Sequence, residues 1–198
     1  MKRLFDITFS FLGLLLLCPA LLFIGALIKK EDRGPVFYRG VRVGRDGRPF
    51  KIFKFRTMVV NADKIGGSST PENDLRITRV GKFLRSYKID ELPQLINVLR
   101  GEMSFVGPRP QVQWAVELYS DEEKLLLSVR PGITDYASIR FRNEAEILKG
   151  SANPDRDYME KIAPEKIRLS LEYVKGISLW TDIKIIFLTI KALFQKAD

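Results

Sequence analysis

The chain begins with a long run of apolar residues. Residues 7–28 contain no charged side chain. As a straight helix this run would be roughly 33 Å long, at about 1.5 Å per residue, and the hydrocarbon layer of a bilayer is about 30 Å thick. The pattern therefore predicts a membrane anchor over residues 1–30. Pro19 lies near its middle and predicts a break, because proline lacks a backbone donor and clashes with the preceding turn.

Basic residues flank this run on both sides. Lys2 and Arg3 precede it, and Lys29 and Lys30 follow it. Cytoplasmic ends of membrane segments carry an excess of Lys and Arg, so positive charge at both ends gives no orientation for a span. The pattern favours a re-entrant hairpin that bends at Pro19 and leaves by the face it entered, with a kinked span as the alternative. A cleaved signal peptide fits less well because the apolar run is long.

Two strands are predicted after the anchor, over residues 36–43 and 50–58, both rich in aromatic and branched side chains. The Asp-Gly pair at Asp46-Gly47 between them is typical of a hairpin turn. The alternation of apolar and polar side chains in the second strand is interrupted at Ile52-Phe53, which predicts a bulge. Polar residues 61–74 predict a loop.

Apolar spacing of i, i+3, i+4 and i+7 predicts amphipathic helices over residues 80–87 and 92–99, the second ending at Gly101. Further helices are expected over residues 112–119, 164–174 and 179–194. One side of the last helix is apolar and carries Trp180, Ile183, Phe187, Ile190 and Phe194. That side either docks on the core or lies in the lipid headgroup layer.

The elements together predict an α+β fold that is mostly helical. It consists of a re-entrant membrane helix-break-helix, a short β-hairpin and a bundle of amphipathic, interfacial helices. Residues 31–198 are expected to form one integrated cytoplasmic catalytic domain at the membrane surface.

Composition narrows the chemistry. The net charge of +9 indicates anionic partners such as phosphates, acidic lipid or nucleic acid. The chain has no His, which excludes a His base or ligand, and its single Cys18 excludes a disulfide within one chain. Acid–base and metal chemistry must therefore rest on carboxylates, Lys, Tyr or bound water.

Adjacent acids at Asp90 and Glu91 stand just before the predicted helix that contains Pro93. Acids at a helix start commonly serve as caps. Basic side chains of the neighbouring segments change this interpretation, and the strongest phosphate-binding candidates are Lys54, Arg56, Arg85, Arg109 and Arg130. Two carboxylates among cations suit a magnesium-dependent phosphoryl site, in which one acid holds the metal and the other attacks phosphorus. The alternative for each cation is a solvated face or contact with anionic lipid.

Six segments, taken in order, carry a resemblance to a known family. They are Lys2-Arg3-Leu4-Phe5-Asp6, Phe53-Lys54-Phe55-Arg56-Thr57-Met58, Gly81-Lys82-Phe83-Leu84-Arg85, Asp90-Glu91-Leu92-Pro93-Gln94-Leu95-Ile96-Asn97-Val98-Leu99, Met103-Ser104-Phe105-Val106-Gly107-Pro108-Arg109-Pro110 and Arg130-Pro131-Gly132-Ile133-Thr134. Their order and spacing resemble the bacterial sugar transferases, the monotopic polyprenol-phosphate phosphoglycosyl transferases, in their minimal catalytic-domain form.

The resemblance implies a reaction at the bacterial inner membrane, with the active site facing the cytoplasm. A phosphosugar passes from a UDP-sugar to polyprenol (undecaprenyl) phosphate, which releases UMP and begins glycoconjugate assembly such as exopolysaccharide biosynthesis. Asp90 matches the nucleophile that forms a covalent aspartyl-phosphosugar intermediate. Glu91 matches the partner acid, which together with Asp90 is expected to bind Mg²⁺. Arg85, Arg109 and Arg130 match phosphate- or nucleotide-binding positions.

Two departures from the family pattern are visible. The membrane helix of the family breaks at a Pro that often follows Ser, whereas Cys18 precedes Pro19 here. After Thr134, many members continue with Gly, whereas this chain has Asp135-Tyr136. The second departure bears on the choice of sugar.

Two noncatalytic functions compete with this interpretation. The basic hairpin with its Phe residues is compatible with a membrane-tethered nucleic-acid binder, and the net charge is compatible with a scaffold on anionic lipid. The uncharged anchor and the paired acids argue against nucleic acid as a partner. The nucleic-acid binder predicts salt-sensitive binding to oligonucleotides and indifference to the loss of Asp90. The lipid scaffold predicts binding to liposomes without magnesium-dependent use of any nucleotide sugar.

Overall fold

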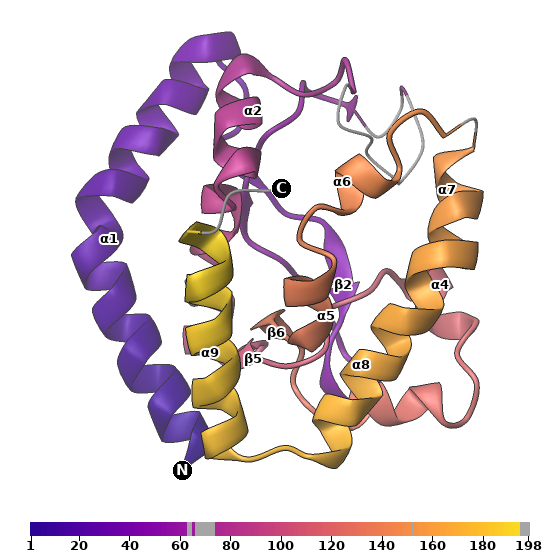
Figure 1. Cartoon of the computed structure of the whole chain (residues 1–198). Coiled ribbons are helices and arrows are strands. Elements are labelled where there is room, and N and C mark those ends of the chain that lie inside the picture. The colour runs from indigo at the N-terminus through magenta and orange to yellow at the C-terminus, as the bar shows by residue number, and fades with distance from the viewer. Residues whose placement is uncertain (63–64, 66–73, 152, 195–198) are drawn as a thin grey trace.

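The computed structural model describes residues 1–62, 65, 74–151 and 153–194, and these form a mostly helical α+β fold, as predicted (Figure 1). The strands of the described residues form three two-stranded sheets. Helix α1 (Lys2–Asp32) runs along one side of the molecule, and the other elements pack beside it.

The predicted break at Pro19 is wrong, because α1 is one continuous helix of 31 residues that contains Pro19. Figure 1 shows that the helix bows instead of breaking. Proline removes one hydrogen bond of the ladder, and contacts at both ends of α1 hold the flanking turns in line. Within the described residues, α1 alone is long and apolar enough to cross a membrane, and its apolar centre is largely exposed.

One face of α1 packs on the rest of the chain. Asp6 and Ser10 are buried near its start, and Gly25 and Ile28 are buried near its end. Ile28 shares a core cluster with Phe55 and Leu84, so the membrane helix contributes to the hydrophobic core.

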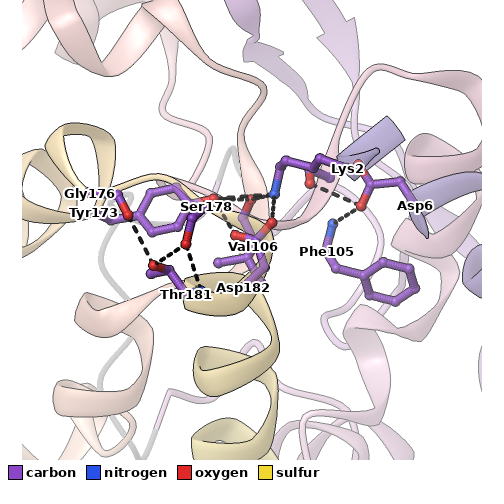
Figure 2. A network of polar contacts seen from close by, with 10 residues as sticks. Lys2, Asp6, Phe105, Val106, Tyr173, Gly176, Ser178, Thr181 and Asp182 are labelled. Atoms are coloured by element: carbon purple, nitrogen blue, oxygen red, sulfur yellow. Dashed lines mark hydrogen bonds and ion pairs between the residues drawn. The ribbon is translucent and has the colours of Figure 1, made fainter. Parts of the chain in front are cut away.

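Polar contacts tie the start of α1 to distant elements (Figure 2). The ammonium of Lys2 donates to Asp182 Oδ2 at 2.5 Å and to the Val106 carbonyl at 3.0 Å, and Tyr173 donates to Asp182 Oδ1 at 2.7 Å. Asp6 accepts from the Phe105 backbone at 3.2 Å. The start of the anchor is therefore part of the fold rather than a loose basic flank.

The far end of α1 is held equally firmly. Asp32 forms a two-pronged ion pair with Arg56, and Glu31 accepts from the backbone N–H of Arg79 at 2.8 Å. That N–H belongs to the first turn of α2 (Arg79–Ser86), whose orphan donors favour a carboxylate.

The predicted hairpin is present, but each long strand is divided into two. The described segments are β1 (Phe37–Tyr38), β2 (Val41–Val43), β3 (Pro49–Lys51) and β4 (Lys54–Phe55), and antiparallel pairing joins β1 to β4 and β2 to β3. Ile52-Phe53 interrupts the second strand, as predicted, because both side chains turn into the core. Asp46 and Gly47 form the turn with φ of 56° and 74°. Of the predicted loop 61–74, residues 63–64 and 66–73 lie outside the described residues.

The predicted helix 92–99 begins as a 3₁₀ turn, η3 (Ile89–Gln94), and continues as α3 (Leu95–Arg100). Gly101 ends it with φ of 81°, a conformation that favours glycine. The predicted helix 112–119 is shorter and forms α4 (Gln113–Glu117), followed by the 3₁₀ helix η4 (Glu123–Ser128).

A parallel strand pair was missed in the sequence. Strands β5 (Ser104–Val106) and β6 (Gly132–Thr134) lie in segments punctuated by proline and glycine. A Cβ on Gly132 would lie 2.1 Å from the Gly107 nitrogen, so this crossing requires glycine.

The remaining helices follow β6. They are α5 (Tyr136–Arg140), α6 (Glu144–Ile147), α7 (Pro154–Asp157), the π-helix η5 (Tyr158–Ile162), α8 (Ala163–Lys175) and α9 (Leu179–Phe194). The last two match predicted helices. In α9, Asp182 and Ile185 are buried whereas Trp180 and Phe187 are 78% and 68% exposed, so the docking interpretation of the predicted apolar side is wrong.

Candidate active site

Asp90 and Glu91 lie in the first turn of η3 rather than before a helix. Lys88 precedes them in the left-handed conformation, with φ of 56°. No side-chain cap hydrogen bond is made at this helix start. The two acids are therefore available for other partners, and both side chains lie in the midst of cations.

Glu91 is the centre of an ion cluster. Both terminal nitrogens of the Arg109 guanidinium donate to its two oxygens, and Lys54 Nζ lies 2.9 Å from its Oε1. Burial alone would raise the pKa of Glu91, but the charges and hydrogen bonds of Arg109 and Lys54 hold it well below its usual range. The charge of Glu91 in turn raises the pKa of Arg109. Both groups are fixed in their charged forms.

Asp90 is engaged much less. It is 7% exposed, and among the described residues its one ion pair is with Lys54, at 3.5 Å. The same ammonium lies closer to Glu91. A desolvated carboxylate without a guanidinium partner is better suited to nucleophilic attack than one clamped at both oxygens.

Asn97 positions Lys54 and was missed as a site residue. Its side chain is fully buried, accepts from the Phe53 backbone at 2.8 Å and donates to the Lys51 carbonyl at 2.9 Å. These bonds fix the strand that carries Lys54 against the helix that follows Glu91. The signal in the sequence is a polar residue inside the apolar run Leu95-Ile96-Asn97-Val98, because buried amides need partners.

Arg109 is held by its backbone. The Pro108 carbonyl accepts from the Gly132 backbone at 2.9 Å, and the Gly107 N–H donates to the Thr134 carbonyl at 3.0 Å. The parallel strand pair thus fixes the loop whose arginine reaches Glu91, while its side chain remains 40% exposed. Lys88 lies close enough to feel the charges of Glu91 and Arg109. Removal of water around its ammonium lowers the pKa of Lys88, although the side chain keeps exposed surface.

The structure does not bring all predicted site residues together. Arg56 is buried in its ion pair with Asp32 at the end of α1. The charge of Arg85 acts on Asp74, whose pKa is lowered mainly by its hydrogen bond with Arg76. Pro19 lies in the exposed centre of α1.

Arg130 also lies elsewhere. Its Nε donates to the Gly101 carbonyl at 2.8 Å, at the end of α3 opposite to Glu91. Lys54, Asp90, Glu91 and Arg109 are therefore the predicted residues that the structure gathers into one site.

Asp90 and Glu91 are adjacent carboxylates and could supply two of the ligands that a magnesium ion needs. Within the described residues there is no group of three or more Asp, Glu or Cys side chains arranged to hold a metal. Mg²⁺ commonly uses one or two carboxylates together with water and substrate phosphates. Asp90 and Glu91 can supply that donor set once a phosphate lies between them and the cations.

Comparison with known proteins places this geometry in a family. The family model described as bacterial sugar transferase matches residues 1–196. A UDP-glucose:undecaprenyl-phosphate glucose-1-phosphate transferase of Klebsiella pneumoniae is 46% identical over 195 residues, which cover 96% of this chain and 39% of that protein. A UDP-N-acetylgalactosamine-undecaprenyl-phosphate N-acetylgalactosaminephosphotransferase of Aeromonas hydrophila is 37% identical, over 97% of this chain and 43% of that protein.

A shorter relative matches over most of its own length. The exopolysaccharide production protein ExoY of Sinorhizobium fredii is 38% identical over 97% of this chain and 84% of that protein. The chain thus spans about two fifths of the larger relatives and most of ExoY. The chain belongs to the bacterial sugar transferase family.

Proposed function

We propose that the protein transfers a phosphosugar from a UDP-sugar to a polyprenol phosphate such as undecaprenyl phosphate. The single observation that carries this proposal is the contrast between two adjacent acids. Asp90 is buried with one long ion pair, and Glu91 is clamped by Arg109 and Lys54. The names of the relatives support the same class of donor and acceptor.

In the first displacement, a carboxylate oxygen of Asp90 attacks the sugar-side phosphorus of the donor. A new P–O bond forms to Asp90, the P–O bond to the bridging oxygen breaks, and UMP leaves with that oxygen. The product on the protein is an aspartyl-phosphosugar. Arg109 and Lys54 lie where they can bind the diphosphate, since guanidinium and ammonium groups suit phosphate oxygens.

In the second displacement, a phosphate oxygen of the polyprenol phosphate attacks the same phosphorus. The Asp90–phosphorus bond breaks, Asp90 returns as a carboxylate, and the polyprenol diphosphate sugar leaves. Two steps through one covalent intermediate let a single site serve a soluble donor and a lipid acceptor in turn. Neither step needs a histidine base, which the chain lacks.

Glu91 with Asp90 would hold Mg²⁺. When bound, the ion would offset the charge that gathers on phosphate oxygens during transfer. Arriving phosphates give Arg109 and Lys54 new anionic partners, which makes an oxygen of Glu91 available. In this way the ion cluster keeps Glu91 charged until the donor binds.

We infer that the protein is monotopic in the bacterial inner membrane, with its active site facing the cytoplasm. Lys2 contacts Asp182, and Asp32 at the other end of α1 contacts Arg56. Because both ends bind the same folded body, a straight crossing would place one of these contacts on the wrong side of the bilayer. An α1 that lies along one face of the bilayer, with its bowed and exposed apolar centre in the lipid, meets this constraint and sets Asp90 within reach of a lipid phosphate.

The decisive variant is Asp90→Asn, which keeps the shape of the side chain and removes the nucleophilic oxygen. Purified protein with magnesium, undecaprenyl phosphate and a panel of UDP-sugars should release UMP with at least one donor. Asp90→Asn should lose this release, and intact mass spectrometry without the acceptor should show the added phosphosugar on the wild type alone.

Asp121→Asn is the matched control, because Asp121 is an exposed acid whose one ion-pair partner among the described residues is Lys124. It should keep wild-type turnover. Wild-type turnover by properly folded Asp90→Asn would refute the nucleophile assignment. Failure of every UDP-sugar with the wild type would favour a noncatalytic binder of lipid or nucleic acid.

A further inference from the structure

Four arginines lie beside α3, two of them at its C-terminal end and two over Phe53, whose backbone hydrogen-bonds to Asn97 of the same helix. Arg3 donates to the carbonyls of Val98 and Leu99 at 2.6 and 2.9 Å, and Arg130 donates to that of Gly101 at 2.8 Å. Arg39 and Arg100 lie over the ring of Phe53, with guanidinium carbons 4.1 and 5.1 Å from its centroid. The four come from α1, the link between β1 and β2, α3, and the segment before β6.

This arginine cluster (Arg3, Arg39, Arg100 and Arg130) lacks a compensating acid. Among the carboxylates that the structure describes, none lies within 4.0 Å of a nitrogen of these four side chains. Glu102, the nearest acid in the sequence, accepts from the Asn97 amide at 2.7 Å. The end of a helix carries about half a negative charge, far less than four positive charges. The positive charge of the cluster is therefore largely uncompensated within the described residues, and the cluster can attract an anion.

The cluster borders the membrane helix. On α3, Leu95 lies 3.3 Å from the position that a Cβ on Gly13 of α1 would take, and Val36 has the same spacing to Gly25. Arg100 and Arg39 follow these contacts within a few residues, and both side chains are exposed. Phe37 and Tyr38 beside Arg39 are 38% and 45% exposed. Exposed arginines and aromatic rings next to a membrane helix are the composition of the headgroup layer.

We propose that the arginine cluster binds the phosphates of anionic glycerophospholipids, at a site separate from the reaction centre. Arg3 and Arg130 contact carbonyls at the C-terminal end of α3, whereas Asp90 and Glu91 precede that helix in η3. The inference rests on the proposed membrane placement of α1 and does not require the transfer reaction. Arg39 and Arg100 contribute most of the binding free energy, because N–H groups of Arg3 and Arg130 already donate hydrogen bonds to helix carbonyls. Lipid bound there would hold the domain at a fixed depth.

The test uses the full chain in neutral detergent, titrated with dioctanoyl phosphatidylglycerol and followed by thermal unfolding. Arg39→Gln/Arg100→Gln should weaken the apparent affinity about 30-fold, which corresponds to about 2 kcal/mol at 1.4 kcal/mol per tenfold, or about 1 kcal/mol per cation. Arg39→Lys/Arg100→Lys keeps both positive charges and should retain most of the affinity. This variant also shows whether the protein still folds when both arginines are replaced. The effect should shrink in high salt.

Arg156→Gln/Arg168→Gln is the matched control, since it removes two exposed arginines from α7 and α8, on the opposite side of the molecule from α1 (Figure 1). It should bind phosphatidylglycerol as the wild type does. Equal weakening in both double variants, or equal stabilisation by dioctanoyl phosphatidylcholine, would overturn the proposal.

Farnesyl phosphate and inorganic phosphate separate the possible sources of the bound phosphate. Neither should displace phosphatidylglycerol at matched concentration, and displacement by farnesyl phosphate would assign the cluster to the acceptor instead. UMP release in neutral nanodiscs should be unchanged in Arg39→Gln/Arg100→Gln. A failure of the proposed reaction would leave the lipid titration intact, so the two proposals fail separately.

Discussion

At the scale of single residues, Asp90 and Glu91 are adjacent in the chain and differ in what surrounds them. Glu91 accepts two guanidinium bonds and an ammonium, which lower its pKa against the effect of burial. Asp90 shares only the longer contact with Lys54. The pair of acids could be recognised from the sequence as a site, but this division between them could not, because it depends on a loop eighteen residues downstream.

Arg109→Lys tests whether the two-pronged geometry of the guanidinium contact contributes to activity in addition to its positive charge. Lysine keeps the positive charge but cannot place two parallel donors on one carboxylate or phosphate. We expect kcat/KM for the UDP-sugar to fall about 10- to 100-fold, which is the range for one charge-assisted hydrogen bond. Steady-state UMP release measures the change.

Arg168→Lys is the control for that variant, because Arg168 makes a similar two-pronged contact with Glu165 on an exposed surface. It should leave kcat/KM unchanged. An Arg109→Lys enzyme with wild-type kinetics would mean that Arg109 contributes only its charge.

At the scale of elements, helices with strong apolar spacing were predicted well. The helix α9 has the bounds that the pattern gave, and α8 differs by one residue at each end. The pair β5–β6 was missed because its strands have three residues each and neighbour Gly and Pro, and because parallel pairing joins segments far apart in sequence. The predicted break at Pro19 was wrong, because contacts at the two ends of α1 compensate for the backbone hydrogen bond that proline removes.

The site was predictable only where it depends on local sequence. Asp90, Glu91, Lys54 and Arg109 were all proposed, and the structure brings them together. Arg56 and Arg130 were proposed on similar grounds, yet tertiary contacts direct them to Asp32 and to the Gly101 carbonyl. Charge alone does not distinguish a cation that binds substrate from one that fixes the fold.

The contact between α1 and α9 gives a prediction at this scale. Lys2→Met leaves buried Asp182 with Tyr173 as its remaining described side-chain partner. Because a buried charge then lacks its cation, we expect the unfolding temperature to fall by about 10 °C. Lys2→Met/Asp182→Asn should recover part of this loss, because no buried charge is then left unpaired. Thermal unfolding in detergent of the two single variants and the double variant measures the coupling.

The exposed pair Asp121–Lys124 provides the comparison. Solvent weakens such pairs, so its own set of single and double variants should show no measurable coupling. Strictly additive losses for Lys2 and Asp182 would mean that their contact contributes nothing to the docking of α1.

At the scale of the whole molecule, α1 and the elements that it contacts form one packed body. Ile28 of α1 completes a core cluster with Phe55 and Leu84, and polar contacts hold both helix ends. The anchor therefore determines the orientation of the site as well as its attachment. The expected domain boundary at residue 30 stays a prediction, and the helix itself continues to Asp32.

Membrane topology is the test at this scale. In a Cys18→Ala background, a cysteine added before Met1 and a separate Lys30→Cys should both react with a membrane-impermeant maleimide from the cytoplasmic face. Inverted and right-side-out vesicles provide the two orientations. Reaction of the two positions from opposite faces would exclude the monotopic arrangement.

The contacts of Lys2 also bear on how the protein is made. Its partners Val106, Tyr173 and Asp182 lie 104 to 180 residues further along the chain, so during synthesis the start of α1 leaves the ribosome long before any of them exists. Until α8 and α9 have been made, Lys2 lacks its contacts with Tyr173 and Asp182. Docking of α9, which carries Asp182, then fixes the start of α1, so we expect this contact to form late in folding.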